Sequence, residues 1–549
     1  MRINIIAPSA SKETVVFPVS PVTGESVTGE SVTGEYITGV STASGLLRSS
    51  KTSRRFAGNA GWEIAASGNA ATGNAVTGNA VTGNARYFQL WNIRGWLSLG
   101  WLSLGWLILG CTWTPAMAEE NWPQFRGPNS RGVAAEGSAD AAATSSKYAD
   151  RWSASENIAW SIEVAGRGWS SPVVWGERIY LTTVVSGQEP EPAKKGLYFG
   201  GERIKPPESV HQWKVMCLDL KTGERVWEKQ VHEGVPQSSI HIKSTFASET
   251  PVTDGKHLYC CFGSLGIFCL DMDGNTKWKF DLEPLPTRLG WGAAASPVLH
   301  EGRLYYCNDN EKASSLLCLD AASGKELWTV AREEKSNWST PYVWKHAQRT
   351  EIVTAGSGMV RSYDLDGNVL WTLKGMSSIT IATPYEAQGL LIVSSGYVGD
   401  QQRPIYAIKP GATGDISLPE GETSSAYVAW SQPKAGPYNP TTLVHHGRLY
   451  VLYDRGLFAC YDAATGREIY SQQRLPNGRA FTTSPWAIGD KIFCLNEDGV
   501  TYVIQEGDEF KVLHTNTLEE DDMGMATPAL ISGKQLLRTA KRLYCIGKP

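Results

Sequence analysis

The chain has 549 residues, of which 42% are hydrophobic and 19% are charged, and its formal net charge is −4. Residues 119–549 carry 43 Lys and Arg against 50 Asp and Glu, a balance of −7. A nucleic-acid-binding domain needs a basic face, so we expect no nucleic-acid partner. The hydrophobic content is ample for a core, and the length after residue 118 suits one large repeat domain.

Residues 1–90 contain short tandem repeats, including PVTGESVTGESVTGEYITGV at 21–40 and GNAATGNAVTGNAVTGNA at 68–85. These repeats lack apolar periodicity and cannot bury enough surface to offset the entropy of ordering. We therefore expect this region to be disordered. An alternative is that it is translated repetitive DNA upstream of the true start, although no Met lies between Met1 and Met117.

Residues 91–118 have the layout of a secretory signal peptide. Two arginines precede an apolar run at 96–111, and Ala116-Met117-Ala118 supplies a small-residue cleavage site. The run is interrupted by Gly and Ser and is shorter than the roughly 20 residues of a spanning helix. We expect cleavage after Ala118 and an exported protein in the periplasm or outer cell envelope. A lipid anchor at Cys111 and an uncleaved anchor are the alternatives.

After a leader or linker at 119–155, a dipeptide of Ser, Thr or Asn followed by Pro recurs eight times. Five of the seven intervals between recurrences span 43 to 46 residues, and the intervals that begin at 171 and 383 are longer and carry polar insertions. A period of about 40 to 50 residues built from short strands is typical of β-propeller blades. The recurrences are Ser171-Pro172, Thr250-Pro251, Ser296-Pro297, Thr340-Pro341, Thr383-Pro384, Asn439-Pro440, Ser484-Pro485 and Thr527-Pro528.

Each unit contains four short runs rich in β-branched and aromatic residues, separated by Gly turns. This pattern predicts four antiparallel strands. The last turn carries an acidic residue and Gly and is followed by Trp, as in Asp219 to Gly223 with Trp227, and Asp271 to Gly274 with Trp278. A large aromatic side chain at one fixed place per blade can pack between neighbouring sheets, burying roughly 150 to 250 Å².

The final unit has room for only about three strands. The segment at 156–164 has the pattern of a separate strand, so we expect it to complete the last blade and remove the open edge. The predicted fold is all-β: an eight-bladed propeller of four-stranded antiparallel blades over 156–549, with the last blade closed by an N-terminal strand. We expect the propeller to be monomeric.

Most of the ten cysteines fall at equivalent strand positions in different blades, such as Cys217, Cys269, Cys318 and Cys460. Equivalent positions diverge from the axis and do not meet the Cα separation of a disulfide, about 4.4 to 6.8 Å. We therefore expect most of them to be small buried residues.

The turn Cys217 to Trp227 resembles the PQQ-like β-propeller repeat, whose motif is roughly A-x-D-x-x-T-G-x-x-x-W. The resemblance covers about 156–549. The leader Asn121 to Pro128, followed by Arg167 to Pro172, looks like exported BamB-like propellers of planctomycete-type bacteria. The resemblance implies two activities: PQQ- and Ca²⁺-dependent quinoprotein dehydrogenases, and non-catalytic BamB-like scaffolds that bind proteins or peptides.

The dehydrogenase family places a vicinal Cys–Cys disulfide over PQQ and a Glu/Asn/Asp set on the metal. Cys260-Cys261 matches the dipeptide, but its surroundings, Leu258 to Phe262 between two glycines, predict an ordinary extended strand. The chain lacks a C-x-x-C-H haem site, and the 431 residues after position 118 leave little length for the long loops that cap the cofactor. We therefore expect no cofactor, with PQQ and calcium as the alternative.

Propeller geometry places the residues before each Ser/Thr-Pro motif near one mouth of the central channel. These segments are polar and aromatic, and they predict a channel-mouth ligand or partner site with a polarised distribution of charge suited to an anionic ligand or a charged peptide. Solvated loop charges and packing of the tryptophans between blades are the plainer explanations. The candidate residues are Arg167, Trp169, His241, Lys243, Glu249, Arg288, Trp291, Lys335, Asn337, Trp338, Tyr438, Arg479, Asp521 and Asp522.

The run Asn308 to Glu311 carries four oxygen-bearing side chains, but it lacks EF-hand spacing, and a turn is the favoured interpretation. The sequence contains no G-x-S-x-G, H-E-x-x-H or P-loop motif, so we predict no catalytic or metal-binding residues.

The leading hypothesis is an exported, non-catalytic propeller that binds a protein or peptide in the cell envelope. A PQQ–Ca²⁺ oxidoreductase is the alternative. A carbohydrate-binding propeller is a weaker alternative, indicated only by paired Trp at the channel mouth.

Overall fold

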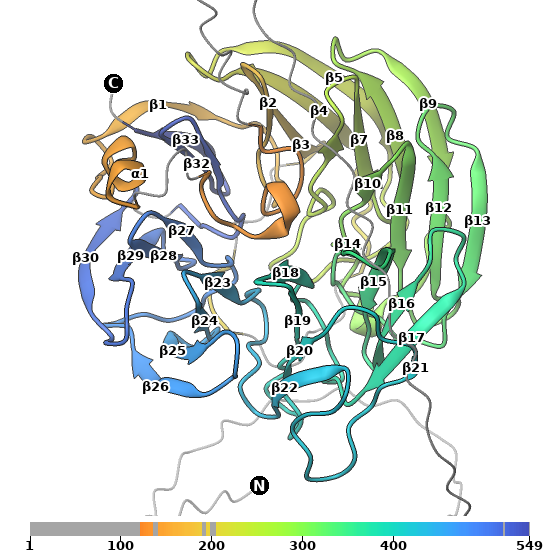
Figure 1. Ribbon diagram of the computed structural model, residues 1–549. Helices are drawn as coiled ribbons and strands as arrows, with labels where there is room; N and C mark the ends of the chain where they lie inside the picture. Colours follow the sequence, from red (N-terminus) through yellow and green to blue (C-terminus); the bar gives the residue numbers. More distant parts are fainter. Residues whose placement is uncertain (1–120, 136–140, 189–193, 198–204, 520–521, 548–549) are drawn as a thin grey trace, which may run out of the picture. The chain divides into compact units, whose positions relative to one another are not determined.

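The computed structural model describes residues 121–135, 141–188, 194–197, 205–519 and 522–547. In these residues, strands form eight sheets that follow one another around a ring (Figure 1). This confirms the prediction of an eight-bladed propeller of four-stranded blades. The predicted disordered region at 1–90 and the signal peptide at 91–118, with Cys111, lie outside the described residues.

In the first four blades the strands pair in chain order. Blade one contains β2 (Val173–Trp175), β3 (Arg178–Ser186), β4 (His211–Asp219) and β5 (Arg225–Gly234). Blade two contains β6 (Val252–Thr253), β7 (His257–Phe262), β8 (Gly266–Asp271) and β9 (Thr276–Asp281). Blade three contains β10 (Val298–His300), β11 (Arg303–Asn308), β12 (Ser315–Asp320) and β13 (Glu326–Ala331). Blade four contains β14 (Tyr342–Lys345), β15 (Thr350–Ala355), β16 (Met359–Tyr363) and β17 (Val369–Lys374).

The remaining blades continue the ring. Blade five contains β18 (Tyr385–Ala387), β19 (Leu390–Ser394), β20 (Ile405–Ile408) and β22 (Val428–Gln432). Blade six contains β23 (Leu443–His445), β24 (Arg448–Leu452), β25 (Leu457–Asp462) and β26 (Glu468–Arg474). Blade seven contains β27 (Trp486–Ile488), β28 (Lys491–Leu495), β29 (Val500–Gln505) and β30 (Val512–Thr517). Blade eight contains β31 (Ala529–Ile531), β32 (Lys534–Arg538), β33 (Arg542–Ile546) and, from the other end of the domain, β1 (Ile158–Glu163).

The strand β1 closes the ring as predicted. It pairs antiparallel with β33, so that Ser161 lies opposite Tyr544 and Glu163 lies opposite Arg542. An ion pair of 3.2 Å joins the side chains of Glu163 and Arg542. This pairing gives blade eight its outer strand and joins the two ends of the domain without a covalent link.

Neighbouring blades are joined by a repeated contact between a tryptophan and a glycine turn. Trp278 lies on the outer strand of blade two. Its indole N–H donates to the carbonyl of Ala321, in the last turn of blade three, at 3.0 Å. The adjacent Gly324 has φ 72°, and a Cβ there would lie 2.5 Å from the Trp278 ring. The same contact occurs at four other seams, where Trp160, Trp227, Trp328 and Trp430 meet the turns of Gly223, Gly274, Gly367 and Gly466. The packing between blades that was predicted for Trp227 and Trp278 is confirmed.

The apolar core lies between neighbouring blades. For example, Val298, Tyr305 and Cys318 of blade three pack with Ile352 and Tyr363 of blade four. The nine cysteines within the described residues are all buried and form no disulfide. Cys260 and Cys261 lie within the extended strand β7, as the sequence predicted.

One unit begins at a different position from the predicted one. The dipeptide Asn439-Pro440 does not open blade six, because β23 starts at Leu443 and the hydroxyl of Thr441 takes the place that Ser and Thr of the motif hold in other blades. In this unit Thr442 stands where the other units have Pro. The sequence assignment was therefore wrong by two residues at this blade.

Residues 121–135 of the predicted leader pack against the inner strands. Trp122 pairs with Val174 of β2, and Val133 pairs with Ala487 of β27. Arg126 is fully buried and donates to the carbonyl oxygens of Ser130, Arg131, Thr442 and Pro485 at 3.0 to 3.3 Å. Burial lowers its pKa to about 10, so the guanidinium remains charged at neutral pH and is satisfied by carbonyls. The leader includes the 3₁₀ turn η1 (Pro128–Ser130), and α1 (Ala141–Lys147) follows.

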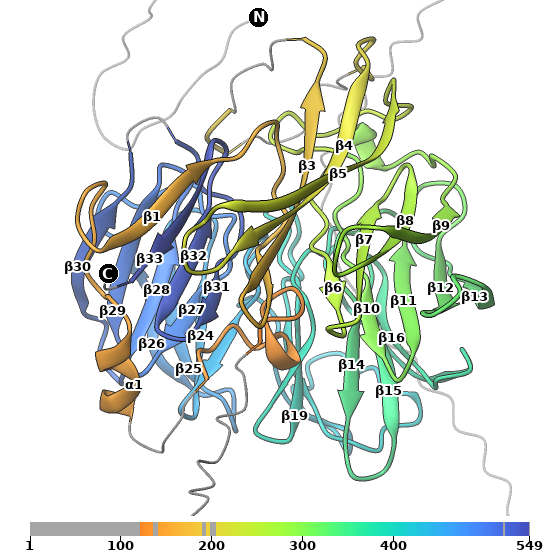
Figure 2. The ribbon, with the colours of Figure 1, turned by 90° about the horizontal axis from the view of Figure 1, so that it is seen from above.

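Two blades carry the predicted insertions. In blade one, β3, β4 and β5 extend beyond the other blades on one face of the ring (Figure 2). In blade five, the connection between β20 and β22 contains β21 (Gly414–Asp415), which adds in parallel to the outer strand β17 of blade four. The insertions therefore extend or cover individual blades and leave the ring intact.

Candidate functional site

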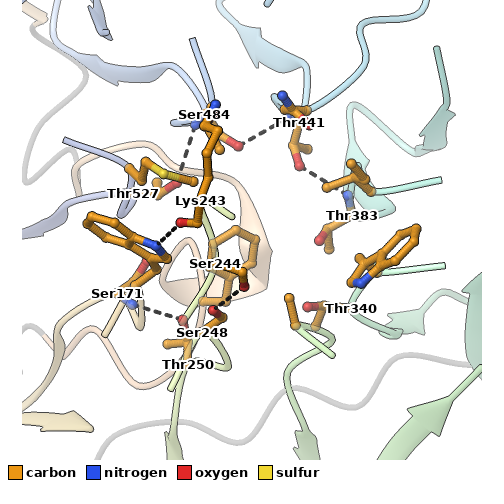
Figure 3. Close-up of a pocket in the computed structure, with 18 of the residues that line it drawn as sticks. Ser171, Lys243, Ser244, Ser248, Thr250, Thr340, Thr383, Thr441, Ser484 and Thr527 are labelled. Atoms are coloured by element: carbon orange, nitrogen blue, oxygen red, sulfur yellow. Dashed lines mark hydrogen bonds between the residues drawn. The ribbon is translucent and has the colours of Figure 1, made fainter. Parts of the chain in front are cut away.

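A ring of hydroxyl groups surrounds the channel at the start of the inner strands (Figure 3). In six of the eight steps from one blade to the next, the backbone N–H of the motif Ser or Thr donates to the side-chain hydroxyl of the motif residue in the next blade. Ser171 donates to Thr250 at 3.0 Å, and Thr250 donates to Ser296 at 2.9 Å. The other four bonds join Ser296 to Thr340, Thr383 to Thr441, Thr441 to Ser484, and Ser484 to Thr527. The recurrent Ser or Thr thus satisfies a buried backbone donor of the neighbouring blade.

The ring encloses a cavity of about 250 Å³ on the channel axis. Aromatic side chains form much of its wall, and Phe125 of the leader also contributes to it. Six of the fourteen predicted site residues line this cavity: Trp169, His241, Lys243, Trp291, Trp338 and Tyr438.

The indole N–H groups of the channel tryptophans differ in their hydrogen-bond partners. Trp169 donates its indole N–H to the carbonyl of Lys243 at 2.7 Å, and Trp338 donates to the carbonyl of Gly292 at 2.7 Å. The indole nitrogen of Trp291 is buried and has no hydrogen-bond partner among the described atoms. The Trp291 and Trp338 rings lie 5.6 Å apart between centroids, and His241 meets the Trp291 ring edge-on at 5.2 Å. The rings of His241, Trp291 and Trp338 therefore form one connected aromatic surface.

The positive charge of Lys243 is neutralised within the protein. Its ammonium group forms a short ion pair with Glu497, whose side chain is completely buried, and it also donates to the carbonyl of Gly196 at 2.8 Å. Glu497 accepts further bonds from the Thr482 hydroxyl at 2.7 Å and the Gly196 N–H at 2.9 Å. A buried carboxylate with this many donors is satisfied, so Lys243 and Glu497 together add no net charge to the wall.

The other titratable groups of the wall are shifted toward their neutral forms. Burial, together with the nearby charge of Lys243, lowers the pKa of His241 to about 4, so its imidazole is neutral at pH 7. Burial also raises the pKa of Asp454 above its ordinary value. Burial likewise raises the pKa of the Tyr438 phenol, whose ring lies 5.3 Å from Tyr397. The wall therefore places a neutral His241 beside the Lys243–Glu497 ion pair.

Four of the predicted basic residues do not line the cavity, although Arg288 lies over the ring of Tyr397, which contacts the cavity residue Tyr438. The backbone of Arg167 bridges to Val184 of β3, and Arg288, within the 3₁₀ turn η2 (Arg288–Gly290), donates to the carbonyl of Ser378 at 3.3 Å. Lys335 and Arg479 are exposed and face Glu311 and Asp498 at 3.9 and 3.7 Å. The structure does not bring these four charges together around the channel.

The remaining predicted polar residues make internal contacts. Glu249 is buried and accepts the N–H of Gly263 at 2.8 Å. Asn337 donates to Asp309, which is paired with Arg332 in a fully buried salt bridge of 2.8 Å. This accounts for part of the polar run Asn308 to Glu311, in which the Asn310 side chain caps a turn.

Asp522 is buried and accepts bonds from the Thr539 hydroxyl and the Lys541 N–H. Asp521 lies outside the described residues.

Two features of the described channel differ from the cofactor set that the dehydrogenase resemblance implies. Cys260 and Cys261 are consecutive residues of a regular strand, where their side chains alternate between faces. Among the described residues, the group of three His, Cys, Asp or Glu side chains close enough to share a metal lies elsewhere, at His445, His446 and Glu506. The basic group of the wall is already engaged by Glu497, whereas PQQ would need cations for its carboxylates.

Sequence reasoning missed several residues of the cavity. Phe125, Leu197, Asp454, Thr482 and Met525 all line it. The hydroxyl ring was visible as the Ser/Thr-Pro repeat, but its position on the channel surface was not deduced. Glu497 carried no local signal, because it follows an ordinary strand and meets Lys243 from 254 residues away.

The comparisons with known proteins support the fold and its repeat. Residues 263–410 match the model of the family described as outer membrane protein assembly factor BamB. The matched stretch runs from blade two into blade five and contains three of the turn-and-tryptophan units. These residues are therefore similar to the repeat of that family. No curated protein matches this repeat propeller.

Solved structures similar to the repeat propeller have low sequence identity to it. The computationally designed Ika8 protein is 10% identical, with a TM-score of 0.46 over 71% of this chain and 99% of that chain. BamB from Moraxella catarrhalis is 14% identical, with a TM-score of 0.34 over 71% and 99%. Quinohemoprotein alcohol dehydrogenase ADHIIG from Pseudomonas putida HK5 is 12% identical, with a TM-score of 0.49 over 78% and 81%.

In the described part of the chain, no helix combines the length and apolar character needed to cross a membrane.

Proposed function

We propose that this protein is a non-catalytic propeller of the cell envelope that binds a peptide segment of a partner protein at the mouth of its channel. The observation that carries the proposal is the aromatic wall of Trp169, Trp291, Trp338 and Tyr438 around a hydroxyl-lined cavity. Aromatic rings give a peptide side chain a surface for packing, and hydroxyl groups serve as donors or acceptors for its backbone. Export is part of the proposal, and the signal-like segment at 91–118 and the family description support it.

The charge of the wall favours an uncharged segment over the anionic ligand considered from the sequence. Lys243 is paired with Glu497, and the lowered pKa of His241 keeps its imidazole neutral. An anion would have to compete with a buried carboxylate for Lys243. A segment with an aromatic or aliphatic anchor has no such cost.

The size of the cavity limits what enters it. Pockets for drug-sized ligands span roughly 300 to 1,000 Å³. At about 250 Å³, the channel cavity has room for one or two side chains. The partner therefore inserts an anchor and makes its other contacts with the surrounding loops.

Selection of random peptides displayed on phage against the purified full chain tests this proposal. Enriched peptides should bind the wild type and lose at least about tenfold in affinity for Trp291→Ala, a change of about 1.4 kcal/mol. Arg479→Ala is the matched control, because Arg479 is exposed and does not line the cavity. Peptides that bind Trp291→Ala and the wild type equally well would reject the channel as the binding site.

A thermal-unfolding titration with PQQ, with and without Ca²⁺, separates this proposal from a quinoprotein function. A ligand at 100 times its dissociation constant adds about 2.7 kcal/mol of stability. We expect no shift in melting temperature with PQQ in either condition. A Ca²⁺-dependent increase would replace the scaffold proposal with a quinoprotein oxidoreductase.

Carbohydrate is the second candidate ligand, and the neighbouring rings of Trp291 and Trp338 favour it because sugar faces stack on aromatic surfaces. Hydrolysis would also need two carboxyl groups about 5 to 9.5 Å apart. In the described site the carboxylate of Glu497 is paired with Lys243. The channel wall therefore favours binding of a carbohydrate without its hydrolysis. Quenching of tryptophan fluorescence by cello- or chito-oligosaccharides, lost in Trp291→Ala, would favour this candidate over a peptide.

A further inference from the structure

The hydroxyl ring of the channel gives its cavity a set of hydrogen-bond donors. Six ring hydroxyls each accept a backbone N–H from the preceding blade. A hydroxyl has one proton and two lone pairs, so each of the six keeps an O–H to donate. In the described part of the chain, no acceptor takes any of these protons. The six line the cavity (Figure 3) and are Thr250, Ser296, Thr340, Thr441, Ser484 and Thr527.

His241 adds a nitrogen donor to the same wall. Its Nδ1 accepts the backbone N–H of Lys243 at 3.2 Å. A backbone N–H only donates, so Nδ1 carries the lone pair and the neutral ring carries its proton on Nε2. The pKa of about 4 keeps the ring in this neutral form at pH 7. No described residue accepts from Nε2, so this N–H is available to a group in the cavity.

The carboxyl group of Asp454 supplies an acceptor. Asp454 lines the cavity and is only 5% exposed, and its backbone carbonyl is fixed by the N–H of Phe481 at 2.9 Å. Among the described residues, no other residue donates to its side chain and no cation forms a salt bridge with it. A carboxyl group keeps an acceptor oxygen in either protonation state. A buried acceptor of this kind gains free energy when a ligand supplies a donor.

The wall therefore favours an uncharged group that both accepts and donates. An aliphatic anchor would displace water from the hydroxyls and from Asp454 and leave them without partners, which costs free energy. An anion would face the carboxyl group of Asp454. A cation would face the positive charges of Lys243, Arg403 and Arg455, which already act on Asp454. A primary amide offers an acceptor oxygen and two N–H donors without a net charge.

We propose that the anchor entering the channel is a primary amide, the side chain of Gln or Asn in the partner's peptide. This inference rests on the proposed function, whose binding site it makes specific. The amide oxygen accepts from ring hydroxyls and from Nε2 of His241, and the amide NH₂ donates to Asp454. The aromatic wall packs against the aliphatic part of the side chain. A cavity of about 250 Å³ has room for one such anchor.

Displayed peptide libraries that differ in one fixed central residue test the anchor. Four libraries carry Gln, Met, Glu or Lys at this position, flanked by random residues, and are selected on the purified full chain. Met matches the length of Gln but lacks the amide. Peptides that bind Trp291→Ala less well than the wild type are taken as channel binders. We expect these to come from the Gln library and to lose about tenfold in affinity when their Gln is replaced by Met.

Two variants of the wall test the residues that select the amide. His241→Phe keeps an aromatic ring beside Trp291 and removes the N–H, and Asp454→Ala removes the acceptor. Each should reduce the preference for the Gln peptide over its Met form by about threefold. A purely structural role would weaken both peptides equally. Arg479→Ala, outside the cavity, should keep the wild-type ratio.

The outcomes separate this inference from the proposed function. Channel binders with Met, Glu or Lys as the preferred anchor would overturn the amide inference and leave peptide binding at the channel in place. An unchanged ratio of Gln to Met affinity in both His241→Phe and Asp454→Ala would also overturn it. Recovery of only those peptides that bind Trp291→Ala and the wild type equally would overturn both proposals.

Discussion

The tryptophans at the blade seams and those at the channel differ in how regularly their surroundings repeat. The seam group, Trp160, Trp227, Trp278, Trp328 and Trp430, donates each time to the carbonyl after the acidic residue of the next blade's turn. The channel group has no common partner: Trp169 bonds to Lys243, Trp338 bonds to Gly292, and Trp291 is unpaired among the described atoms.

This difference separates residues that build the propeller from residues available for function. A side chain that recurs with the same partner at several seams is explained by blade packing. A side chain that recurs at the channel with varying partners is not required by the repeat. The channel group is therefore the better place to look for ligand contacts, and changes to the two groups should have different consequences.

The largest expected effect is at the seam. Gly324→Ala places a Cβ against the Trp278 ring at a position with φ 72°. Left-handed backbone costs a non-Gly residue roughly 1 to 2 kcal/mol, and overpacking adds about 1 to 3 kcal/mol. Denaturant unfolding should show a loss of about 2 to 5 kcal/mol. Gly302→Ala is the control, because it has φ 75° but meets nothing within 4 Å, so it should lose only the backbone share. Equal losses in both variants would contradict the seam contact.

The next expected effect, on the pH dependence of stability, comes from the different pKa shifts of a carboxyl group at the seam and one beside the channel. In the seam turn, hydrogen bonds from Ser323 lower the pKa of Asp320. Next to the channel ring, burial raises the pKa of Glu249 from 4.5 to about 7. Between these two values the folded state holds a proton that the unfolded state has released, so the free energy of unfolding should fall by roughly 3 kcal/mol as pH rises through this window.

Glu249→Gln should remove this part of the pH dependence, which denaturant unfolding at pH 5 and pH 8 would measure. The variant should gain stability relative to the wild type at the higher pH. An unchanged slope in Glu249→Gln would mean that Glu249 is ionised in the folded protein at both pH values.

The smallest effect compares the two groups of tryptophans directly. Trp278→Phe removes the bond to the carbonyl of Ala321, whereas Trp291→Phe removes an indole N–H that has no partner among the described atoms. A typical hydrogen bond contributes about 1 kcal/mol net. Trp278→Phe should therefore be less stable than Trp291→Phe by about 1 kcal/mol in denaturant unfolding. The reverse order would show that the Trp291 indole is more important to folding than its contacts indicate.

The fold was predictable because its contacts repeat. The Ser/Thr-Pro motif marked seven of the eight inner strands, and the acidic turn with its following Trp marked the outer strands of blades one to four. The missed unit is the one in which Thr442 stands in place of Pro, so the pattern pointed to Asn439-Pro440 instead. Pattern recognition failed where the physical requirement, a hydroxyl for the neighbour's N–H, was met without the proline.

The candidate site was predictable only in part. Aromatic residues before the motif lie at the channel because the inner strands start there, which placed Trp169, Trp291 and Trp338. The charges did not follow the same rule. Arg288 and Asn337 come from the same segments, yet their side chains bond to Ser378 and Asp309 and do not line the cavity.

The sequence by itself determined the ring: the number of blades, the strand that closes it and the tryptophans between blades. These follow from periodic patterns, because each blade meets the same physical demands as its neighbours. Only the tertiary structure decided which charges are paired. Lys243 meets Glu497 and Glu506 meets His446 across blades, and such contacts depend on how distant segments are brought together, which no local pattern encodes.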